Sequence, residues 1–411
     1  MNMRKIAWLM VMSLMALPAW GKGNNTTSAS RKGNNTAGGT PYEAAVDVFV
    51  PHAKGSPYKS IRIPCIVNAD GTLIAVAEGR HDKKDQANND IIASVSKNGG
   101  KTWSSPTVAA KADDGTCLNN PCLIYDTVTK QTVLMFQRYP EGMKESGIKA
   151  LDPDDPEALR NYVCFTKNGK TWTKPVEVTR TTRHEDCRTS CSGPNPGVML
   201  TRGEHKGRLV VAFNEAVNFG NWHITAAYSD DHGATWQMGE GRSAKGHGIN
   251  EVSSVETEDG GVLVIARDQS GGGLKCVARS HDGGDTWSDV IHHPELTCTV
   301  CQNGLTRYSF STDAKYGSKS RILFSGPTGK VNTRNAGVIK MSYDDGETWP
   351  VEKSVGDGPF AYSVMCPLKP GYVALLFEAG NEGGIKFTPI SLKWLTDGED
   401  TGLAGGSSKK K

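Results

Sequence analysis

This 411-residue chain lacks long runs of basic residues, and its acidic and basic side chains nearly balance. Lys and Arg number 47 and Asp and Glu number 44, which leaves a formal net charge of +3. Proteins that bind nucleic acids by charge carry a basic face or stripe, so this composition argues against a nucleic-acid partner. The three lysines at positions 409–411 indicate a solvated tail.

Long apolar runs are also scarce, and the one that stands out lies at residues 6–17, close to the N-terminus. This run is too short to span a bilayer, so no transmembrane segment is expected. It follows Arg4 and Lys5 and precedes Ala19-Trp20-Gly21, an order typical of a cleaved secretory signal peptide. We therefore expect a signal peptide over residues 1–21, a flexible linker over 22–40 rich in Asn, Ser, Thr and Gly, and a mature protein that is secreted or periplasmic.

A short motif returns five times along the rest of the chain, at residues 96–103, 166–172, 229–236, 280–287 and 342–349. A typical copy reads Ser-His-Asp-Gly-Gly-Asp-Thr-Trp, and the second copy lacks one residue. An Asp or Asn side chain can hydrogen-bond its own backbone, and Gly accepts a positive φ, so each copy predicts a hairpin turn before the next strand. Copies spaced roughly 50–70 residues apart are typical of a β-propeller, in which each repeat forms one blade.

Between these turns the sequence is strand-like and shows no sustained helical periodicity. Runs such as 72–77, 208–213, 262–266 and 372–377 are short, apolar and bounded by Gly, Asp or Asn. The fold class that we predict is all-β, a six-bladed β-propeller of four-stranded antiparallel blades. Residues 46–50 and 385–392 are expected to pair and close the ring, within one domain over residues 41–401 that is followed by a disordered tail over 402–411.

The chain carries ten cysteines, which in an exported protein suggests disulfides. Cys187 with Cys191, and Cys298 with Cys301, are close enough in sequence for local bridges. They could instead bind zinc, although no neighbouring histidine has zinc-finger spacing, and the sequence does not settle the pairing. Four others lie in apolar, strand-like runs and are expected to be buried thiols: Cys65, Cys164, Cys276 and Cys366.

Three arginines stand out: Arg62 at the entry of a predicted strand, Arg267 at the end of another, and Arg334 in a loop before the last repeat. An arginine at the end of a buried strand needs an anionic partner, because burial of an unpaired charge is costly. Each could pair with a local carboxylate. If the three converge, their guanidinium groups could instead bind a carboxylate or phosphate bidentately.

An ordered set of motifs adds to these arginines and resembles a known family. The matching positions are Arg62-Ile63-Pro64, Glu78-Gly79-Arg80 followed by Asp85, Asn250-Glu251 with Arg267, then Arg334, and finally Tyr362-Ser363. Over nearly all of residues 46–395 the chain resembles the bacterial secreted exo-α-sialidases (neuraminidases), six-bladed propeller enzymes whose repeated turns are known as Asp boxes. The first two copies depart from the pattern, with Asn98 and Asn168 in place of Asp.

The resemblance assigns a role to each matching residue. Arg62, Arg267 and Arg334 would bind the carboxylate that a sialoside carries on its anomeric carbon. Because that carboxylate repels an anionic nucleophile, sialidases use a tyrosine, and the resemblance assigns Tyr362 to this role with Glu251 as its base.

The remaining roles concern the leaving group and the arginines. Asp85 would be the general acid, and later the base that activates water, so that configuration is retained. Glu378 would support Arg62, and Arg80 would line the floor of the site. We assign the repeated turns a structural role.

Other acidic residues could fill the roles assigned to Glu251 and Asp85. Glu215 also ends a strand, but Glu251 is preferred because its downstream strand leads to Arg267. Asp82 and Asp90 share the polar loop of Asp85.

The expected activity is hydrolysis of terminal sialic acid from sialylated glycans such as mucins, glycoproteins and oligosaccharides. Intramolecular release or transfer to another acceptor could use the same residues. A non-catalytic sialic-acid-binding propeller would be indicated by loss of a catalytic residue, and none is lost. No cofactor is required and no metal site is assigned; residues 88–90 offer oxygen ligands without the spacing of a calcium loop. The sequence indicates neither the linkage preference nor the oligomeric state.

Overall fold

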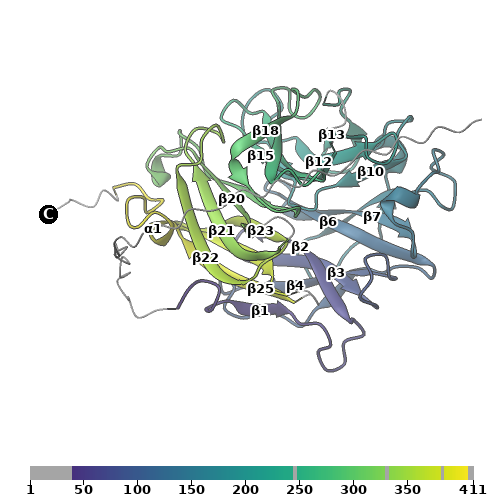
Figure 1. The fold of residues 1–411 in the computed structure, drawn as a ribbon, viewed down its shortest axis with the longest axis horizontal. Coiled ribbons are helices and arrows are strands. Elements are labelled where there is room, and N and C mark those ends of the chain that lie inside the picture. Colours follow the sequence, from purple (N-terminus) through teal and green to yellow (C-terminus); the bar gives the residue numbers. More distant parts are fainter. Residues whose placement is uncertain (1–38, 244–247, 329–332, 381–383, 406–411) are drawn as a thin grey trace, which may run out of the picture. The chain divides into compact units, whose positions relative to one another are not determined.

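Strands occupy most of the chain in the computed structural model, which describes residues 39–243, 248–328, 333–380 and 384–405. The predicted signal peptide, nearly all of the predicted linker, and residues 406–411 of the predicted tail lie outside the described residues. The strands form six antiparallel sheets (Figure 1) arranged as the blades of a propeller, which confirms the predicted fold class. Among the described residues, no helix is long and apolar enough to cross a membrane.

The elements follow one another in a regular order, blade by blade. Blade 1 holds β2 (Ser60–Ala69), β3 (Thr72–Arg80), β4 (Asp90–Ser96) and β5 (Thr107–Ala110), and blade 2 holds β6 (Thr116–Asp126), β7 (Gln131–Pro140), β8 (Arg160–Thr166) and β9 (Val176–Glu177). Blade 3 holds β10 (Thr189–Ser192), β11 (Val198–Met199), β12 (Leu209–Ala216), β13 (Trp222–Ser229) and β14 (Gln237–Met238). Blade 4 holds β15 (Ile249–Glu256), β16 (Val262–Asp268), β17 (Leu274–Ser280) and β18 (Ile291–Thr297), and blade 5 holds β19 (Gly304–Ser309), β20 (Arg321–Pro327), β21 (Asn335–Ser342) and β22 (Val351–Pro359). Blade 6 holds β23 (Ser363–Lys369), β24 (Tyr372–Glu378), β25 (Ile385–Ser391) and β1 (Val46–Phe49); the short helices are 3₁₀ turns at Glu145–Gly147, Thr179–Thr181 and Ala314–Tyr316, and α1 at Leu392–Leu395.

The two ends of the propeller sequence meet in blade 6. Strand β1 pairs antiparallel with β25, with Val46 opposite Phe387 and Phe49 opposite Ile385 (Figure 1). The predicted closing pair is therefore confirmed. Closure places a strand from the start of the fold on the outer edge of the last blade, so that β25 is paired on both sides.

Blade 3 departs from the four-stranded pattern. Its inner position is filled by two short strands, β10 and β11, which pair with successive parts of β12. The segment between them contains Pro194 and Pro196. A proline has no backbone N–H to donate to the ladder, so a continuous inner strand is interrupted there.

Apolar side chains on both faces of the blades form the core, which is divided into clusters between neighbouring blades. Blades 6 and 1, for example, share a cluster that includes Phe49, Ile61 and Phe387. The Trp that ends a repeated turn packs into such a cluster: the Trp103 ring lies edge-on to Phe387, with centroids 5.5 Å apart.

The repeated turns connect the third and fourth strands of blades 1 to 5. Blade 6 has none, because its third and fourth strands come from opposite ends of the fold and no turn joins them. In the turn of blade 5, Asp344 accepts hydrogen bonds from the backbone N–H of Thr348 (2.9 Å) and from the hydroxyls of Thr348 (2.5 Å) and Ser342 (2.8 Å). The side-chain closure predicted for these turns is therefore present.

We expect Asp344→Ala to lower the free energy of unfolding by about 1 kcal/mol, because three hydrogen bonds of an exposed turn are lost. Asp344→Asn is the matched control and should cost less, since Asn98 already makes the equivalent bond to the N–H of Thr102 (3.0 Å) in blade 1. Burial opposes ionisation, but the hydrogen bonds from Thr348 outweigh it and lower the pKa of Asp344. The contribution of Asp344 is thus present above its usual pKa and is lost as pH falls through the lowered value. Urea unfolding of wild type and the two variants measures the free energy of unfolding. An Asp344→Ala variant as stable as wild type would contradict the predicted contribution of Asp344.

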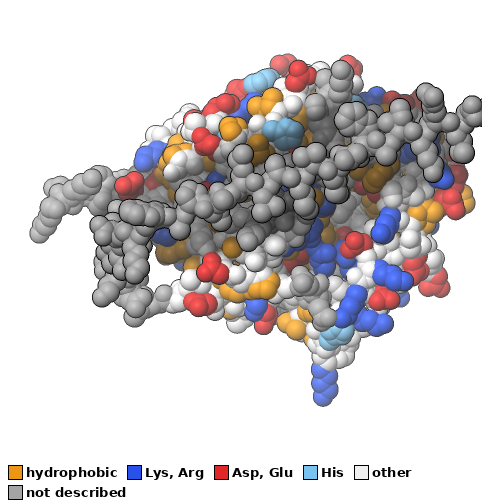
Figure 2. Space-filling view, in the orientation of Figure 1, with side chains coloured by type: hydrophobic (Ala, Val, Ile, Leu, Met, Phe, Trp, Pro, Cys, Tyr) orange, Lys and Arg blue, Asp and Glu red, His pale blue; other side chains and the backbone are white. Residues whose placement is uncertain are grey.

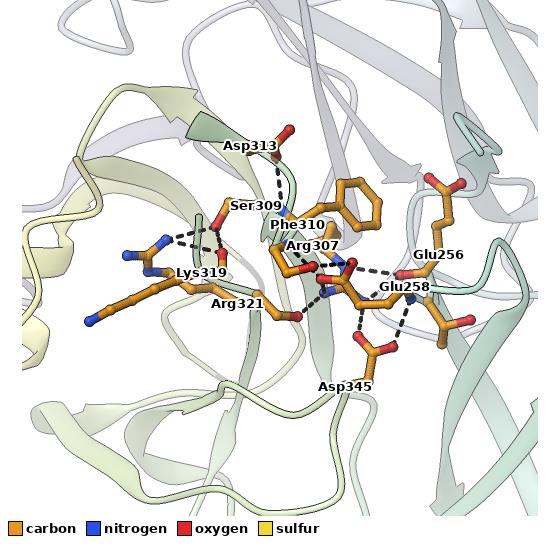
Figure 3. A network of polar contacts seen from close by, with 12 residues as sticks. Glu256, Glu258, Arg307, Ser309, Phe310, Asp313, Lys319, Arg321 and Asp345 are labelled. Atoms are coloured by element: carbon orange, nitrogen blue, oxygen red, sulfur yellow. Dashed lines mark hydrogen bonds and ion pairs between the residues drawn. The ribbon is translucent and has the colours of Figure 1, made fainter. Parts of the chain in front are cut away.

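A polar network ties blades 4 and 5 together at the same end as the repeated turns (Figure 3). Arg307 donates to the backbone oxygen of Glu256 (3.0 and 2.8 Å) and to the carboxylate of Asp345, which belongs to the turn of blade 5. Asp345 also accepts from the N–H of Glu258 (2.7 Å). Because these charges are paired within the protein, we assign the network a structural role. Elsewhere on the face drawn in Figure 2, acidic and basic side chains are mixed, in keeping with the near balance of charge.

Candidate active site

A cavity of about 230 Å³ lies at the end of the propeller opposite the repeated turns. First strands begin and second strands end at this side, so the residues at those positions converge. All seven residues predicted to act on or bind the substrate line the cavity: Arg62, Arg80, Asp85, Glu251, Arg267, Arg334 and Tyr362. Glu378, the predicted support, lies behind Arg62.

Backbone irregularities in the inner strands direct two of these side chains. Strand β15 bulges at Glu251, which has a φ of 44°, and β2 bulges after Arg62, where Ile63 has a φ of 58°. Non-glycine residues avoid this region unless the surrounding structure holds them there, and such residues cluster at functional sites. A bulge also re-aims the neighbouring side chain, so both features indicate a site built at this rim.

Tyr362, Glu251 and Arg267 form the centre of the site. The Tyr362 hydroxyl donates a close hydrogen bond to Glu251 Oε1, while Arg267 Nη1 donates to Glu251 Oε2 (2.7 Å) and to Tyr362 Oη (3.2 Å). Burial favours the protonated acid, but the charge of Arg267 and the hydrogen bond from Tyr362 outweigh it, so the pKa of Glu251 is lowered. Burial, together with the charge of Glu251, raises the pKa of Tyr362 well above its usual value, although Arg267 and Arg334 oppose this. Glu251 is thus an ionised acceptor that faces a neutral phenol.

The three predicted anion-binding arginines surround the Tyr362 ring. The guanidinium carbons of Arg62 and Arg334 lie 5.2 and 5.3 Å from the ring centroid. Arg334 also donates to the Val300 carbonyl (3.2 Å), and Nε of Arg267 is buried with no partner in the part of the chain that the structure describes. The three arginines therefore converge, and the cluster can hold an anion next to the phenol.

Glu378 fixes Arg62 in place. Its two carboxylate oxygens accept from Arg62 Nε (3.1 Å) and Nη2 (2.8 Å), and Oε1 also accepts from the N–H of Ile63 (2.8 Å). Glu378 is fully buried, so this bidentate pair orients the guanidinium with little freedom. The contact agrees with the predicted supporting role.

Asp85 lies at the rim of the cavity and contacts Arg80. Its side chain is 61% exposed, and one carboxylate oxygen accepts from Arg80 Nη1 (2.5 Å). Arg80 is held from its other side by Glu78, with distances of 2.9 and 2.6 Å. Burial opposes ionisation of Asp85, but the charge and hydrogen bond of Arg80, followed by the charges of Arg62 and Arg334, lower its pKa.

The rival carboxylates do not line the cavity. Asp90 accepts from the Tyr58 hydroxyl (2.9 Å) and the N–H of Ala112 (2.8 Å), and Asp82 is exposed. Glu215 is buried against His184, whose ring nitrogen lies 2.5 Å from it. The geometry therefore favours Asp85 and Glu251.

Sequence reasoning missed one acidic residue of the cavity, Glu145. It comes from the long insertion at 137–162, and its carboxylate accepts from Trp222 Nε1 (2.9 Å), Thr189 Oγ1 (2.9 Å) and Asn250 Nδ2 (3.3 Å). Burial raises the pKa of Glu145, and the charge of Glu251 adds to this, while the three hydrogen bonds oppose it. No motif surrounds Glu145 in the sequence, and the insertion holds five other acidic residues, so nothing in the sequence singles Glu145 out.

All ten cysteines are buried free thiols, so the local bridges considered for Cys187/Cys191 and Cys298/Cys301 are not formed. Cys191 lines the cavity, with its sulfur 3.1 Å from the Tyr139 hydroxyl. The four thiols expected to be buried in strand-like runs are buried, which confirms that expectation.

Residues 71–375 match the BNR repeat-like domain family. The chain is 32% identical over 366 residues to the sialidase of Micromonospora viridifaciens, covering 87% of this chain and 55% of that protein. It is 24% identical over 454 residues to the anhydrosialidase of Macrobdella decora, covering 77% of this chain and 57% of that protein. The chain thus spans little more than half the length of these two relatives.

A solved structure supports the fold. The structure of a Hadza microbial sialidase aligns with a TM-score of 0.75 at 24% identity, covering 85% of this chain and 69% of that one. At this identity the likeness bears on the fold alone.

Proposed function

The chain belongs to the sialidase family of BNR repeat-like proteins, and from this premise we propose that it is a retaining exo-α-sialidase that hydrolyses terminal sialic acid from sialylated glycans. Mucins, glycoproteins and oligosaccharides carry such termini. The observation that carries the proposal is the contact of Tyr362 with Glu251 and Arg267 inside the arginine cluster. Export through the signal peptide at 1–21 stays a prediction of the sequence.

Binding of the substrate begins with its charge. The carboxylate on the anomeric carbon accepts hydrogen bonds from Arg62, Arg267 and Arg334, and this orients the sugar over the Tyr362 hydroxyl. Glu378 keeps Arg62 aligned, so less freedom is lost when the ligand binds.

The first chemical step forms a tyrosyl intermediate. Glu251 takes the phenolic proton as the Tyr362 oxygen bonds to the anomeric carbon, and Asp85 donates a proton to the departing glycosidic oxygen. A phenol that is neutral until this step avoids the repulsion that a carboxylate nucleophile would meet.

The second step releases sialic acid. Asp85, now ionised, takes a proton from water, the water oxygen bonds to the anomeric carbon, and Tyr362 leaves and recovers its proton from Glu251. Two displacements at one carbon retain its configuration.

A second candidate function keeps the same residues. One relative is named an anhydrosialidase. Intramolecular release by this chain would use an internal hydroxyl of the sugar in place of water in the second step. Incubation with a sialylated oligosaccharide and mass spectrometry of the product tests both: free sialic acid supports hydrolysis, and a product lighter by one water supports intramolecular release. Binding without any product would favour the non-catalytic, lectin-like alternative.

We expect Arg334→Ala to weaken binding of sialic acid about 10- to 100-fold, because charge-assisted hydrogen bonds contribute about 1.5–3 kcal/mol. Arg334→Lys retains the charge but loses the fork geometry, and should lie between the Ala variant and wild type. Calorimetric titration measures the Kd. The control is a ligand whose carboxylate is replaced by a neutral amide, because its affinity should differ little between wild type and the variants. Unchanged affinity of Arg334→Ala for sialic acid would contradict the proposal that the arginine cluster binds the carboxylate.

A further inference from the structure

Three side chains with metal-binding chemistry meet on blade 4, outside the site described above. The Nε2 atom of His292 lies 3.4 Å from Asp268 Oδ2 and 3.6 Å from Cys276 Sγ, and all three atoms lie within 4.8 Å of one another. We propose that Asp268, Cys276 and His292 form a binding site for a divalent metal ion of the zinc class.

The donor atoms have the separation that a tetrahedral ion requires. Zinc binds nitrogen and oxygen at about 2.0 Å and sulfur at about 2.3 Å, which places neighbouring tetrahedral donors roughly 3.3–3.6 Å apart. The two distances that His292 makes fall in or at the edge of this range. A set of one thiolate, one imidazole and one carboxylate suits zinc better than the hard ions magnesium and calcium, which prefer oxygen donors alone.

The sheet holds the three donors in place. They come from adjacent strands β16, β17 and β18, and Cys276 lies directly opposite His292 in the ladder. The second oxygen of Asp268 accepts from the N–H (2.8 Å) and hydroxyl (2.5 Å) of Ser270, which fixes the orientation of the carboxylate. Such outer hydrogen bonds are typical of metal ligands, because they hold a ligand in position before the ion arrives.

The site is accessible but separate from the catalytic cavity. Asp268 and Cys276 are buried, whereas the His292 side chain is 44% exposed and leaves a path from solvent. Arg267 precedes Asp268 in β16, and consecutive strand residues point to opposite faces. Arg267 lines the cavity, and none of the three donors does. A bound ion would therefore stabilise blade 4 without taking part in the reaction, and water would fill its fourth position.

Cobalt(II) is a suitable probe, because cobalt bound to a thiolate gives a near-ultraviolet charge-transfer band and tetrahedral cobalt absorbs in the visible. Titration of the full chain under reducing conditions should give both signals with one ion per protein, and zinc should displace the cobalt. His292→Ala keeps all ten cysteines and changes a partly exposed side chain. This substitution should weaken cobalt binding at least about 100-fold, because loss of a ligand costs more than loss of a residue that only hydrogen-bonds a ligand.

Two further variants separate this site from other thiols. Cys276→Ala should abolish the thiolate band, whereas Cys298→Ser, near Cys301, should leave it unchanged. Zinc should raise the Tm of wild type but not of His292→Ala, with turnover unaffected. The proposal is overturned if wild type binds no cobalt, if His292→Ala keeps a full-strength band, or if Cys298→Ser removes it.

Discussion

Tyr362→Phe is expected to lower kcat about 10³-fold or more while the Kd for sialic acid stays close to that of wild type. In the proposed mechanism the substitution removes the oxygen that would attack the anomeric carbon, but it leaves Arg62, Arg267 and Arg334 to bind the carboxylate. Steady-state kinetics on an aryl α-sialoside and calorimetric titration with sialic acid measure the two quantities separately.

A second tyrosine of the cavity provides the matched control. Tyr139 lines the same cavity, but its hydroxyl contacts Cys191 rather than the arginine cluster. Tyr139→Phe should therefore keep kcat near that of wild type. If Tyr362→Phe also kept near-wild-type turnover, the nucleophile assignment would have to be abandoned.

Asp85→Asn is expected to slow the release of sugar leaving groups by about 10²–10⁴-fold, because an amide cannot donate the proton that the glycosidic oxygen needs. A nitrophenolate departs without that proton. The same variant should therefore slow the first step much less when the substrate is a nitrophenyl sialoside. Asp82→Asn, in the same loop, is the control and should behave like wild type on both. Because Asp85 is also the base of the second step, which the two substrates share, the comparison is made in kcat/KM, which reports the first step. Equal losses in kcat/KM on the two substrates would contradict the role of Asp85 as general acid.

The electrostatics of Asp85 imply that binding and protonation are coupled. In the free protein its pKa is lowered, against burial, by Arg80 and then by Arg62 and Arg334. A substrate carboxylate would neutralise part of the charge of Arg62 and Arg334, which favours the protonated form of Asp85. Activity should therefore fall as pH rises through the Asp85 pKa of the complex, as expected of a general acid.

The fold could be predicted in some detail because its repeated turns follow from local chemistry. An Asp or Asn two residues after a Ser or Thr, and a Gly that accepts positive φ, close the turn whatever surrounds it, as Asn98 and Asp344 both do. The interruption between β10 and β11 was not anticipated, although Pro194 and Pro196 were visible in the sequence.

The site was predicted through motif order rather than through geometry. Arg62, Glu251 and Tyr362 each stand in a recognisable motif, and the structure brings them together across the propeller axis. Glu145 has no motif, and its position in the cavity depends on where a long insertion folds. The donor set of the proposed metal site depends on strand register, which places His292 opposite Cys276 and which composition does not reveal.

The most direct test of the central claim is the anomeric configuration of the first product. The protein is mixed with an aryl α-sialoside, and the product is followed by proton NMR from the earliest turnover, before mutarotation. Attack by Tyr362 and then by water predicts that the α-anomer of sialic acid appears first. First release of the β-anomer would mean a single displacement by water, and would contradict the tyrosyl intermediate on which the account depends.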